Sequence, residues 1–369
     1  MDLGDVREHL RPLRRRLGHP YRMWAVNRGL PPMPEDAIVP LEQAHDVVLL
    51  CSRYRPPYVV PQAHVSELAF GHELAAHGRA FAVADDARDV FDKSVVWFIP
   101  GDGRDFVAPR LWDYSAQMRA FAAGMEQQGN RPFCSSEETA FWENKSHMHK
   151  RLDEVGAPTP RTVVLTADNW RSESFDAAPV LIKEEHSSAS QGVHHFKSAD
   201  AARQFVERHP FRRGESLIMQ EVVQGATMDM RLTMVGDRMI EEASYWRKKN
   251  PAALASPEWT TTATSYDSIV EHANIPESVV PMAAEVLRKL GIRTAGIDLI
   301  WVDDDLDREP LFLELSPYYQ PNPPKPARYA DWSYKQYKKK WRNVKEGYLH
   351  QQYWVFRRIA AEAIDQELL

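Results

Sequence analysis

The sequence predicts an α/β protein in which a small α/β domain precedes a larger unit of mixed helices and strands (α+β). Short apolar runs of strand length alternate with helical segments over the first third, which is the pattern of an open α/β sheet. In the last third, a helix is followed by two apolar strands that face each other across an acidic turn. Hydrophobic residues make up 43% of the 369 residues and charged residues 27%, a composition typical of globular proteins.

The first third contains three strand-like runs. The apolar run 45–51 has the length of a buried strand, and 79–84 and 95–99 are two further runs of this kind. A helix is predicted over 66–77, between the first two strands. Residues 1–44 are rich in Pro and Arg, and we expect an extended lead-in with one short helix.

A capping signal opens the middle third. Ser135 is followed three residues later by Glu138, the spacing of a capping box. A single helix is predicted from there toward Gly156, since glycine is frequent just beyond a helix C-terminus. The prolines at 158 and 160 then provide a rigid exit.

Strand and helix signals alternate through the rest of the chain. Strands are predicted at 162–165, 180–183 and 216–223, and Ser198 is expected to cap a helix before the last of these. A small, polar segment after the second strand has the character of a mobile loop.

The last third begins with another helix. Pro276 suits its first turn, and Gly291 is expected to end it. Two strands at 296–302 and 310–316 follow.

Composition argues against several classes of protein. The formal net charge is −6, so there is no general attraction to nucleic acid or anionic membranes. No apolar run reaches the length of a membrane span, and no apolar segment follows the basic N-terminus as it would in a secretory signal. Cys51 and Cys134 form no zinc or redox spacing, and we expect two buried thiols in a cytoplasmic protein. The P-loop motif is absent, and no GxGxxG follows a strand.

Two acids in the last pair of strands suggest a metal site. Asp298 lies in an otherwise apolar run, and strand alternation predicts that Phe312, Glu314 and Ser316 share one face. A carboxylate within an apolar strand is costly unless a cation compensates it, and magnesium takes one or two carboxylates together with phosphate oxygens. Two exposed acids on a solvated face remain an alternative. The aspartates of the turn 303–307 are interpreted as a solvated charge run.

Two lysines and one strand end suggest an anion and nucleotide site. Lys183 ends an apolar strand and precedes a Ser/Gly-rich loop whose N–H groups suit phosphate oxygens, and Gly192 permits close approach. Lys145 lies on the helix that precedes this strand. The strand that ends at Gln220 and Glu221 has the character of a hinge whose backbone pairs with an adenine edge. Each signal has an alternative when it is taken singly: Lys183 as a surface lysine beside a loop, and Gln220 and Glu221 as an ordinary strand end.

The order of these motifs resembles the ATP-grasp superfamily, which includes glutathione synthetases, D-alanine–D-alanine ligases and the enzymes that ligate glutamate to the terminus of ribosomal protein S6. The matching stretches are 143–160, 178–193, 217–234 and 296–317, which together span roughly half of the chain. Each motif is moderately specific, and their ordered set is much more specific. The resemblance implies an ATP-grasp fold with a preceding small α/β domain.

The resemblance also implies which residues bind ATP. The two lysines match residues that hold the phosphates, and the loop after Lys183 would close over them and exclude water. The hinge matches the adenine site, and Asp229, which follows the hinge, would meet the ribose or brace the hinge. The residues matched to ATP are Lys145, Lys183, Ser190, Gly192, Gln220, Glu221, Val223 and Asp229.

Metal ligands and catalytic residues follow from the same resemblance. Asp298 and Glu314 match the acids that hold Mg²⁺, and Ser316 stands where the superfamily usually has Asn, which leaves the number of metal ions open. Arg231 and Arg247 match the basic residues that steady the transferred phosphoryl group and the acyl phosphate. For Arg247 the match is loose, and either of the two lysines that follow it is an alternative.

The activity implied is an ATP- and Mg²⁺-dependent carboxylate–amine ligase that forms an amide bond through an acyl phosphate. The substrates would be a small-molecule or peptide carboxylate and an amine, with neither membrane nor nucleic acid as partner, and homodimers are frequent among similar enzymes. Two alternatives are an ATP-grasp kinase that phosphorylates an acceptor, and a non-catalytic ATP-binding module. The serine at 316 keeps the second of these open.

Four segments are expected in the chain. Residues 1–135 would form the N-terminal α/β domain, 136–225 the central subdomain and 226–325 the C-terminal subdomain with the metal site. Residues 326–369 would be a helical tail, basic and aromatic between 334 and 348. That stretch is interpreted as an amphipathic helix packed on the core, with a docking surface for a peptide or carboxylate, or for nucleic acid, as alternatives.

Overall fold

The structure is a computed structural model that describes most of the chain. The described residues are 29–51, 61–97, 111–142, 144–174, 179–186, 192–211, 214–249, 269–272, 274–339 and 346–369. Ser190 and most of the predicted phosphate loop lie outside them, as do the N-terminal lead-in before residue 29 and residues 340–345 of the tail.

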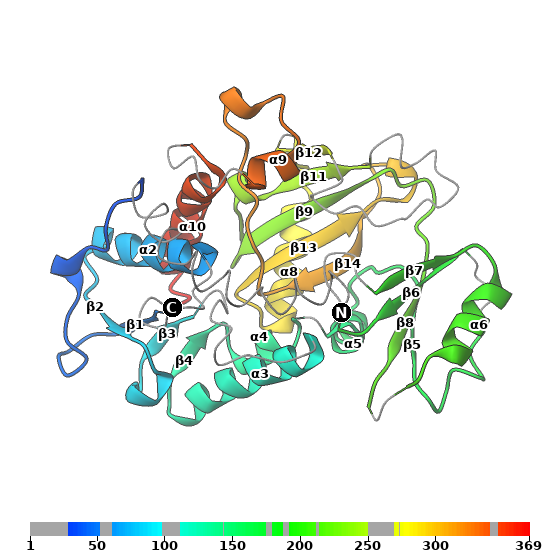
Figure 1. The fold of residues 1–369 in the computed structure, drawn as a ribbon, viewed down its shortest axis with the longest axis horizontal. Coiled ribbons are helices and arrows are strands. Elements are labelled where there is room, and N and C mark those ends of the chain that lie inside the picture. The colour runs from blue at the N-terminus through cyan, green and yellow to red at the C-terminus, as the bar shows by residue number, and fades with distance from the viewer. Residues whose placement is uncertain are drawn as a thin grey trace, which may run out of the picture.

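The N-terminal region is built on a parallel four-stranded sheet (Figure 1). Its strand order is β2-β1-β3-β4, with β1 at Val47–Leu50, β2 at Phe81–Ala84, β3 at Ser94–Val96 and β4 at Arg131–Phe133. The strands alternate with helix α2 (Pro61–Ala76), with the short 3-10 helix η3 (Ala87–Asp89) and with α3 (Leu111–Gln127). The predicted strands are therefore present, and α2 starts five residues before the predicted helix.

Both faces of this sheet are covered, as expected of parallel strands. Val47 and Leu49 pack with α2 and with the last helix, α10 (Tyr348–Asp365), whereas Val48 packs with α3. The C-terminal helix therefore shares a core with the N-terminal region, and Figure 1 shows α10 beside α2. Both cysteines are buried, as predicted.

The helix predicted from Ser135 to Gly156 is two helices. The capping box of Ser135 and Glu138 forms as predicted, but α4 ends after one turn, at Ser136–Thr139, and α5 runs over Lys145–Glu154. Asn144 precedes α5 in a non-helical conformation, which short polar residues adopt readily. The prediction of one continuous helix was therefore wrong, and the break puts Lys145 at the start of α5.

The central region is an antiparallel four-stranded sheet with one helix on its outer face (Figure 1). The strand order is β5-β8-β6-β7. Its core contains Val180, Ile182 and Met219, which alternate along their strands with residues of the opposite face. The elements are β5 (Thr162–Leu165), β6 (Val180–Glu184), β7 (Val193–Phe196), α6 (Ala199–Arg208) and β8 (Leu217–Glu221).

A larger antiparallel sheet forms the middle of the molecule (Figure 1). Its order is β12-β11-β9-β13-β14, with β10 also paired to β9. Helices α5 and α8 pack against one face, and α5 also contacts β8 of the central sheet. The elements are β9 (Met228–Val235), β10 (Arg238–Met239), β11 (Tyr245–Lys248), β12 (Ile269–Glu271), α8 (Val279–Leu290), β13 (Thr294–Ile300) and β14 (Leu311–Ser316).

A β-bulge changes the face assignment in β14. Asp298 pairs with Glu314, but the next residue of β13, Leu299, pairs with Phe312, so Leu313 is the extra residue. Phe312 and Leu315 both lie in the core of the large sheet. The prediction that Phe312 shares a face with Glu314 was therefore wrong, because the bulge resets the alternation.

The remaining segments are short helices and the C-terminal region. Helix α9 (Tyr334–Lys339) precedes α10. Among the described residues, no helix is both long and apolar enough to cross a lipid bilayer. The other 3-10 helices are η1 (Glu35–Ala37), η4 (Glu241–Ala243), η5 (Val302–Asp304) and η6 (Ala327–Tyr329).

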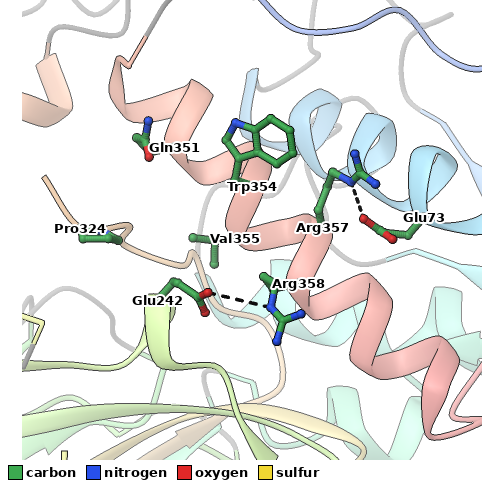
Figure 2. Close-up of a pocket in the computed structure, with 8 residues that line it drawn as sticks. All are labelled: Glu73, Glu242, Pro324, Gln351, Trp354, Val355, Arg357 and Arg358. Carbon is green, nitrogen blue, oxygen red and sulfur yellow. Dashed lines mark hydrogen bonds and ion pairs between the residues drawn. The ribbon is translucent and has the colours of Figure 1, made fainter. Parts of the chain in front are cut away.

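A cavity of about 360 Å³ opens beside α10 (Figure 2). Trp354 lines it, and the ion pairs Arg357–Glu73 and Arg358–Glu242 lie at its sides. None of the predicted site residues lines this cavity.

Candidate functional site

The register of the large sheet brings five charged residues together. Asp298 on β13 lies directly opposite Glu314 on β14 and opposite Arg231 on β9. Two residues away along β9, Asp229 lies opposite Arg247 on β11. Because Ile297 and Leu299 point into the core, Asp298 and its cross-strand partners lie on the other face.

Four of these side chains form a continuous ionic network. Arg231 donates through Nε to Asp298 Oδ1 at 2.5 Å and through Nη2 to Oδ2 at 3.0 Å. Arg247 Nη2 lies 2.9 Å from Asp298 Oδ2, and its Nε donates to Asp229 Oδ1 at 2.6 Å. All four side chains are at most 18% exposed, so their charges meet in a largely dry environment.

The network keeps Asp298 ionised. Burial raises the pKa of this carboxyl group, but Arg231 and Arg247 outweigh burial, so its pKa lies below the ordinary value. For Asp229, burial is the larger effect and its pKa is raised, although Arg247 opposes this. Asp298 is therefore the better anionic ligand of the two.

Gly296 makes room for Arg231. A Cβ at this position would lie 2.7 Å from Arg231 Nη1 and 3.1 Å from the Cβ of Tyr319. The guanidinium therefore lies close over the backbone of β13, beside Tyr319. Any side chain at 296 would displace one of these neighbours.

Lys183 lies on the inner face of the central sheet. It is only 9% exposed, and its ammonium donates to Gln220 Oε1 at 2.6 Å. Gln220 in turn donates from Nε2 to the hydroxyl of Thr162 at 2.9 Å. The side chain of Gln220, predicted at the adenine hinge, therefore positions a predicted phosphate-binding lysine.

Lys145 approaches Lys183 from α5. It is 7% exposed, and its backbone N–H donates to the carbonyl of Glu185 at 3.4 Å. The Glu185 side chain accepts hydrogen bonds from Ser146 on α5 and from the backbone of Ser216, the latter at 3.2 Å. Glu185, which the sequence analysis did not single out, thus fastens the start of α5 to the central sheet.

The two lysines and the two acids share one electrostatic environment. The pKa of Lys183 falls to about 8, because burial and the nearby charge of Lys145 oppose protonation. Glu314 and Asp298 act on the same ammonium in the opposite direction. Helix α5 contacts both β8 and β14, which pair with β6 and β13 respectively, so residues from α5, β6, β13 and β14 lie near one another.

His149 is a member of this group that sequence reasoning missed. It is 5% exposed, and Gln220 Nε2 lies 3.5 Å from its Nε2. Burial, Lys183 and Lys145 lower its pKa to about 3, so the ring is neutral. Its Nδ1 has no hydrogen-bond partner among the described residues. Position 149 follows Lys145 by one helical turn, which is the signal that would have found it.

The hinge after β8 is held from two sides. The Glu221 carboxylate accepts a hydrogen bond from the backbone N–H of Arg161 at 3.1 Å. The backbone N–H of Val223, two residues further on, donates to no group within the described chain. The carboxylate of Asp304 accepts from the Thr227 N–H at 2.9 Å. That acidic turn therefore does more than face solvent, because it ties the segment after β8 to the β13–β14 connection.

Gly192 and Ser316 have local partners. Gly192 has a φ of +68°, and its carbonyl accepts from the Glu184 N–H at 2.8 Å, which closes the β6–β7 hairpin. The Ser316 hydroxyl donates to the carbonyl of Tyr318 at 2.6 Å.

The acids fit a magnesium ion bound together with a phosphate. Asp298 and Glu314 supply two carboxylates from adjacent strands, which is the number that Mg²⁺ takes with phosphate oxygens and water. Within the described ranges, no cluster of three or more His, Cys, Asp and Glu side chains is assembled for a metal. Two carboxylates are fewer than the six ligands of Mg²⁺, so phosphate oxygens and water would complete its coordination.

Comparison with solved structures identifies the fold. The D-cycloserine synthetase DcsG is 17% identical over 86% of this chain and 99% of its own, with a TM-score of 0.50. A D-alanine–D-alanine ligase from Bacillus anthracis, complexed with ATP, is 14% identical over 85% of this chain and 99% of its own, with a TM-score of 0.45. An ATP-grasp RimK domain protein from Sphaerobacter thermophilus is 16% identical over 73% of this chain and 90% of its own, with a TM-score of 0.46.

No family model matches the sequence, and no curated protein matches it. The chain has the α/β ATP-grasp fold that its sequence predicted.

Proposed function

We propose that the protein is an ATP- and Mg²⁺-dependent carboxylate–amine ligase that forms an amide bond through an acyl phosphate. The observation that carries this proposal is the effect of three residues on Lys183: Lys145 lowers its pKa, and Asp298 and Glu314 raise it. The contacts of α5 with β8 and with β14 support the proposal that these two cations and two carboxylates serve one site. A triphosphate with its magnesium ion satisfies both sets of charges.

In this proposal Lys145 and Lys183 bind the phosphate oxygens. Both side chains are buried, and the charge of Lys145 contributes to the lowered pKa of Lys183. Gln220 fixes Lys183 in place through its 2.6 Å hydrogen bond, so little reorganisation is needed on binding. Magnesium held by Asp298 and Glu314 would neutralise charge on the β- and γ-phosphates when bound.

The hinge is proposed to take the adenine. The N–H of Val223, which bonds to no described acceptor, is suited to a ring nitrogen, and the bond from Glu221 to Arg161 fixes the segment. Gly192 and Ser190 would belong to the loop that covers the phosphates. The bond between Asp229 and Arg247 favours a bracing role for this acid over contact with the ribose.

Arg231 and Arg247 are proposed to steady the transferred phosphoryl group. The substrate carboxylate attacks the γ-phosphorus, a P–O bond forms, and the bond to the β-phosphate oxygen breaks as ADP leaves. An amine then attacks the acyl carbon, the C–N bond forms, the bond from the acyl carbon to the phosphate oxygen breaks, and the amine proton leaves with inorganic phosphate. Both arginines are held by Asp298, so their charge is already oriented where negative charge develops.

The substrates are proposed to be small molecules or peptides, and cytoplasmic location and homodimer formation stay predictions. An ATP-grasp kinase remains an alternative activity. A non-catalytic ATP-binding module is favoured by one observation, because the Ser316 hydroxyl is engaged with the Tyr318 carbonyl.

A substrate panel distinguishes these functions. The full chain is incubated with Mg·ATP and pairs of carboxylates and amines, and ADP and inorganic phosphate are measured. A ligase releases both products, and phosphate release depends on the amine. A kinase forms ADP without free phosphate, and a binding module shows no turnover with any pair.

The matched variants are Glu314→Gln and Glu309→Gln. Glu309 is exposed beside the same hairpin, so its change should leave turnover intact. Glu314→Gln should abolish turnover, and unchanged activity would contradict the proposed metal site.

A further inference from the structure

Arg231 has hydrogen-bonding capacity that its network does not use. A guanidinium carries five N–H donors, and Arg231 uses one on Nε and one on Nη2 to hold Asp298. Nothing else among the described residues accepts a hydrogen bond from it. Its side chain is 18% exposed, so these donors face a partly closed space. A buried cation of this kind is suited to a second anion.

Helix α9 supplies a second cation at this place. Ser333 and Gln336 cap the helix reciprocally: the Ser333 N–H donates to Gln336 Oε1 at 2.8 Å, and the Gln336 N–H donates to Ser333 Oγ at 3.2 Å. The Tyr334 hydroxyl donates to the carbonyl of Pro323 at 2.8 Å, which ties α9 to the segment after β14. Val270 of β12 packs against the hydrophobic cluster that contains Tyr334 and Tyr337 of α9, and Figure 1 shows the label of α9 beside those of β11 and β12.

The ammonium of Lys338 is held over two aromatic rings. Its Nζ lies 5.7 Å from the ring centre of Tyr334 and 5.4 Å from that of Tyr348. Both rings are buried, and Tyr337 joins them in edge-to-face contacts. The stem of Lys338 is therefore supported by a rigid cluster that fixes where its charge lies.

A chain of hydrogen bonds joins the surroundings of Lys338 to those of Arg231. Tyr245 lies directly opposite Arg231 in the large sheet, and its hydroxyl accepts a hydrogen bond from Asn322 Nδ2 at 2.5 Å. Asn322 Oδ1 accepts from the hydroxyl of Tyr348 at 3.0 Å, and Lys338 lies over the ring of Tyr348. Burial lowers the pKa of Lys338 to about 8, and the charge of Arg231 contributes to this. Two like charges held together in a partly buried space repel, and an anion between them removes that repulsion.

We propose that Lys338 and Arg231 together bind the substrate carboxylate that becomes the acyl phosphate, which makes α9 the substrate-side wall of the active site. The inference rests on the proposed function and adds a specificity residue from the C-terminal segment. Arg231 contacts Asp298, so an anion bound to the free donors of Arg231 lies next to the proposed metal site. Lys145 and Lys183 lie with the nucleotide phosphates, whereas Lys338 serves the acyl group.

The test uses inorganic phosphate, which is the anion released at this site in the proposed reaction. Its dissociation constant is measured by ³¹P NMR line broadening on the full chain, with and without saturating Mg·ADP. Lys338→Met removes the charge and keeps an apolar stem on the tyrosine rings. We expect it to weaken phosphate binding about tenfold and to leave Mg·ADP binding unchanged.

Two variants separate charge from structure. Lys335→Met changes an exposed lysine of the same helix and should bind phosphate as the wild type does. Lys338→Arg restores the charge and should restore most of the affinity, which a purely structural role for the lysine would not produce. Thermal melting of all three variants verifies that α9 stays docked.

The outcomes distinguish this inference from the proposed function. Equal phosphate affinity in wild type and Lys338→Met, or no phosphate binding by the wild type in either state, overturns the inference. In a third outcome, the wild-type protein binds no Mg·ADP, but Lys338→Met still binds phosphate more weakly than the wild type does. The anion site then stands and the proposed function fails.

Discussion

The region around Lys145 and Lys183 and the ionic network of Arg231, Asp298, Arg247 and Asp229 are both buried. The charged groups in the two regions have different bonding partners. On the central sheet, Lys183 bonds to the neutral amide of Gln220, and the nearest titratable groups include Lys145 and a neutral His149. On the large sheet, Asp298 is bonded to two guanidiniums, and one of these also holds Asp229. Lys183 is therefore bonded to a neutral group, whereas the charged groups of the network are bonded to groups of opposite charge.

This difference separates binding from stability. A buried cation that is bonded only to a neutral group destabilises the free protein but can bind an anion with little rearrangement. A balanced network contributes little net stability, yet loss of one partner leaves another charge buried and unpaired. Charge removal should therefore have opposite effects on stability in the two regions.

The largest effect is expected when the balanced network is broken. Asp298→Ala leaves Arg231 and Arg247 without their shared carboxylate, and we expect a loss of about 3–5 kcal/mol in the free energy of unfolding. Urea titration measures this. Asp307→Ala, at an exposed position of the adjacent turn, should stay within about 0.5 kcal/mol of wild type. A similarly small change for Asp298→Ala would show that the network is not balanced as described.

The second effect is on nucleotide affinity. Lys183→Met removes a charge-assisted contact to phosphate, so Mg·ATP binding should weaken by about 10- to 100-fold in calorimetry. Because burial and Lys145 already disfavour the ammonium, the free protein should keep or gain stability. Lys197→Met, at an exposed position just after β7, is the control for affinity. Marked destabilisation by Lys183→Met would show that the buried ammonium of Lys183 does not destabilise the free protein.

The fold was predictable where signals are local. Three such predictions are present in the structure: the strand at 162–165, the helix after Ser198, and the end of α8 at Gly291. Side-chain alternation, capping and a positive φ each act over a few residues. The break of the helix before Asn144 and the bulge at Leu313 were missed. At both places a backbone N–H bonds to a segment far along the chain: that of Lys145 to the Glu185 carbonyl, and that of Phe312 to the Pro158 carbonyl.

The site was predictable as a set of residues but not as a set of contacts. Motif order led to Lys145, Lys183, Asp298 and Glu314. The pairing of Asp298 with Arg231 and Arg247 comes from strand register between segments far apart in the chain, which no local pattern encodes. For the same reason Glu185 and Lys338 could not be assigned in advance.

The smallest expected effect is the pH dependence contributed by His149. Its pKa is about 3 in the folded protein and about 6.5 when unfolded, so the unfolded state binds more protons between these values. Stability is therefore lost as pH falls below about 6.5, by about 2 kcal/mol at pH 5 from this residue alone. His149→Gln should show a shallower loss in urea titrations across this range, whereas His77→Gln, at an exposed position, should follow wild type.

The most direct test is a crystal structure of the full chain with Mg²⁺ and a non-hydrolysable ATP analogue. We predict that the phosphates lie between the ammonium groups of Lys145 and Lys183 on one side and a metal ion bound by Asp298 and Glu314 on the other. A nucleotide bound elsewhere, or phosphates that contact the lysines while both carboxylates lie out of reach of the metal, would contradict it.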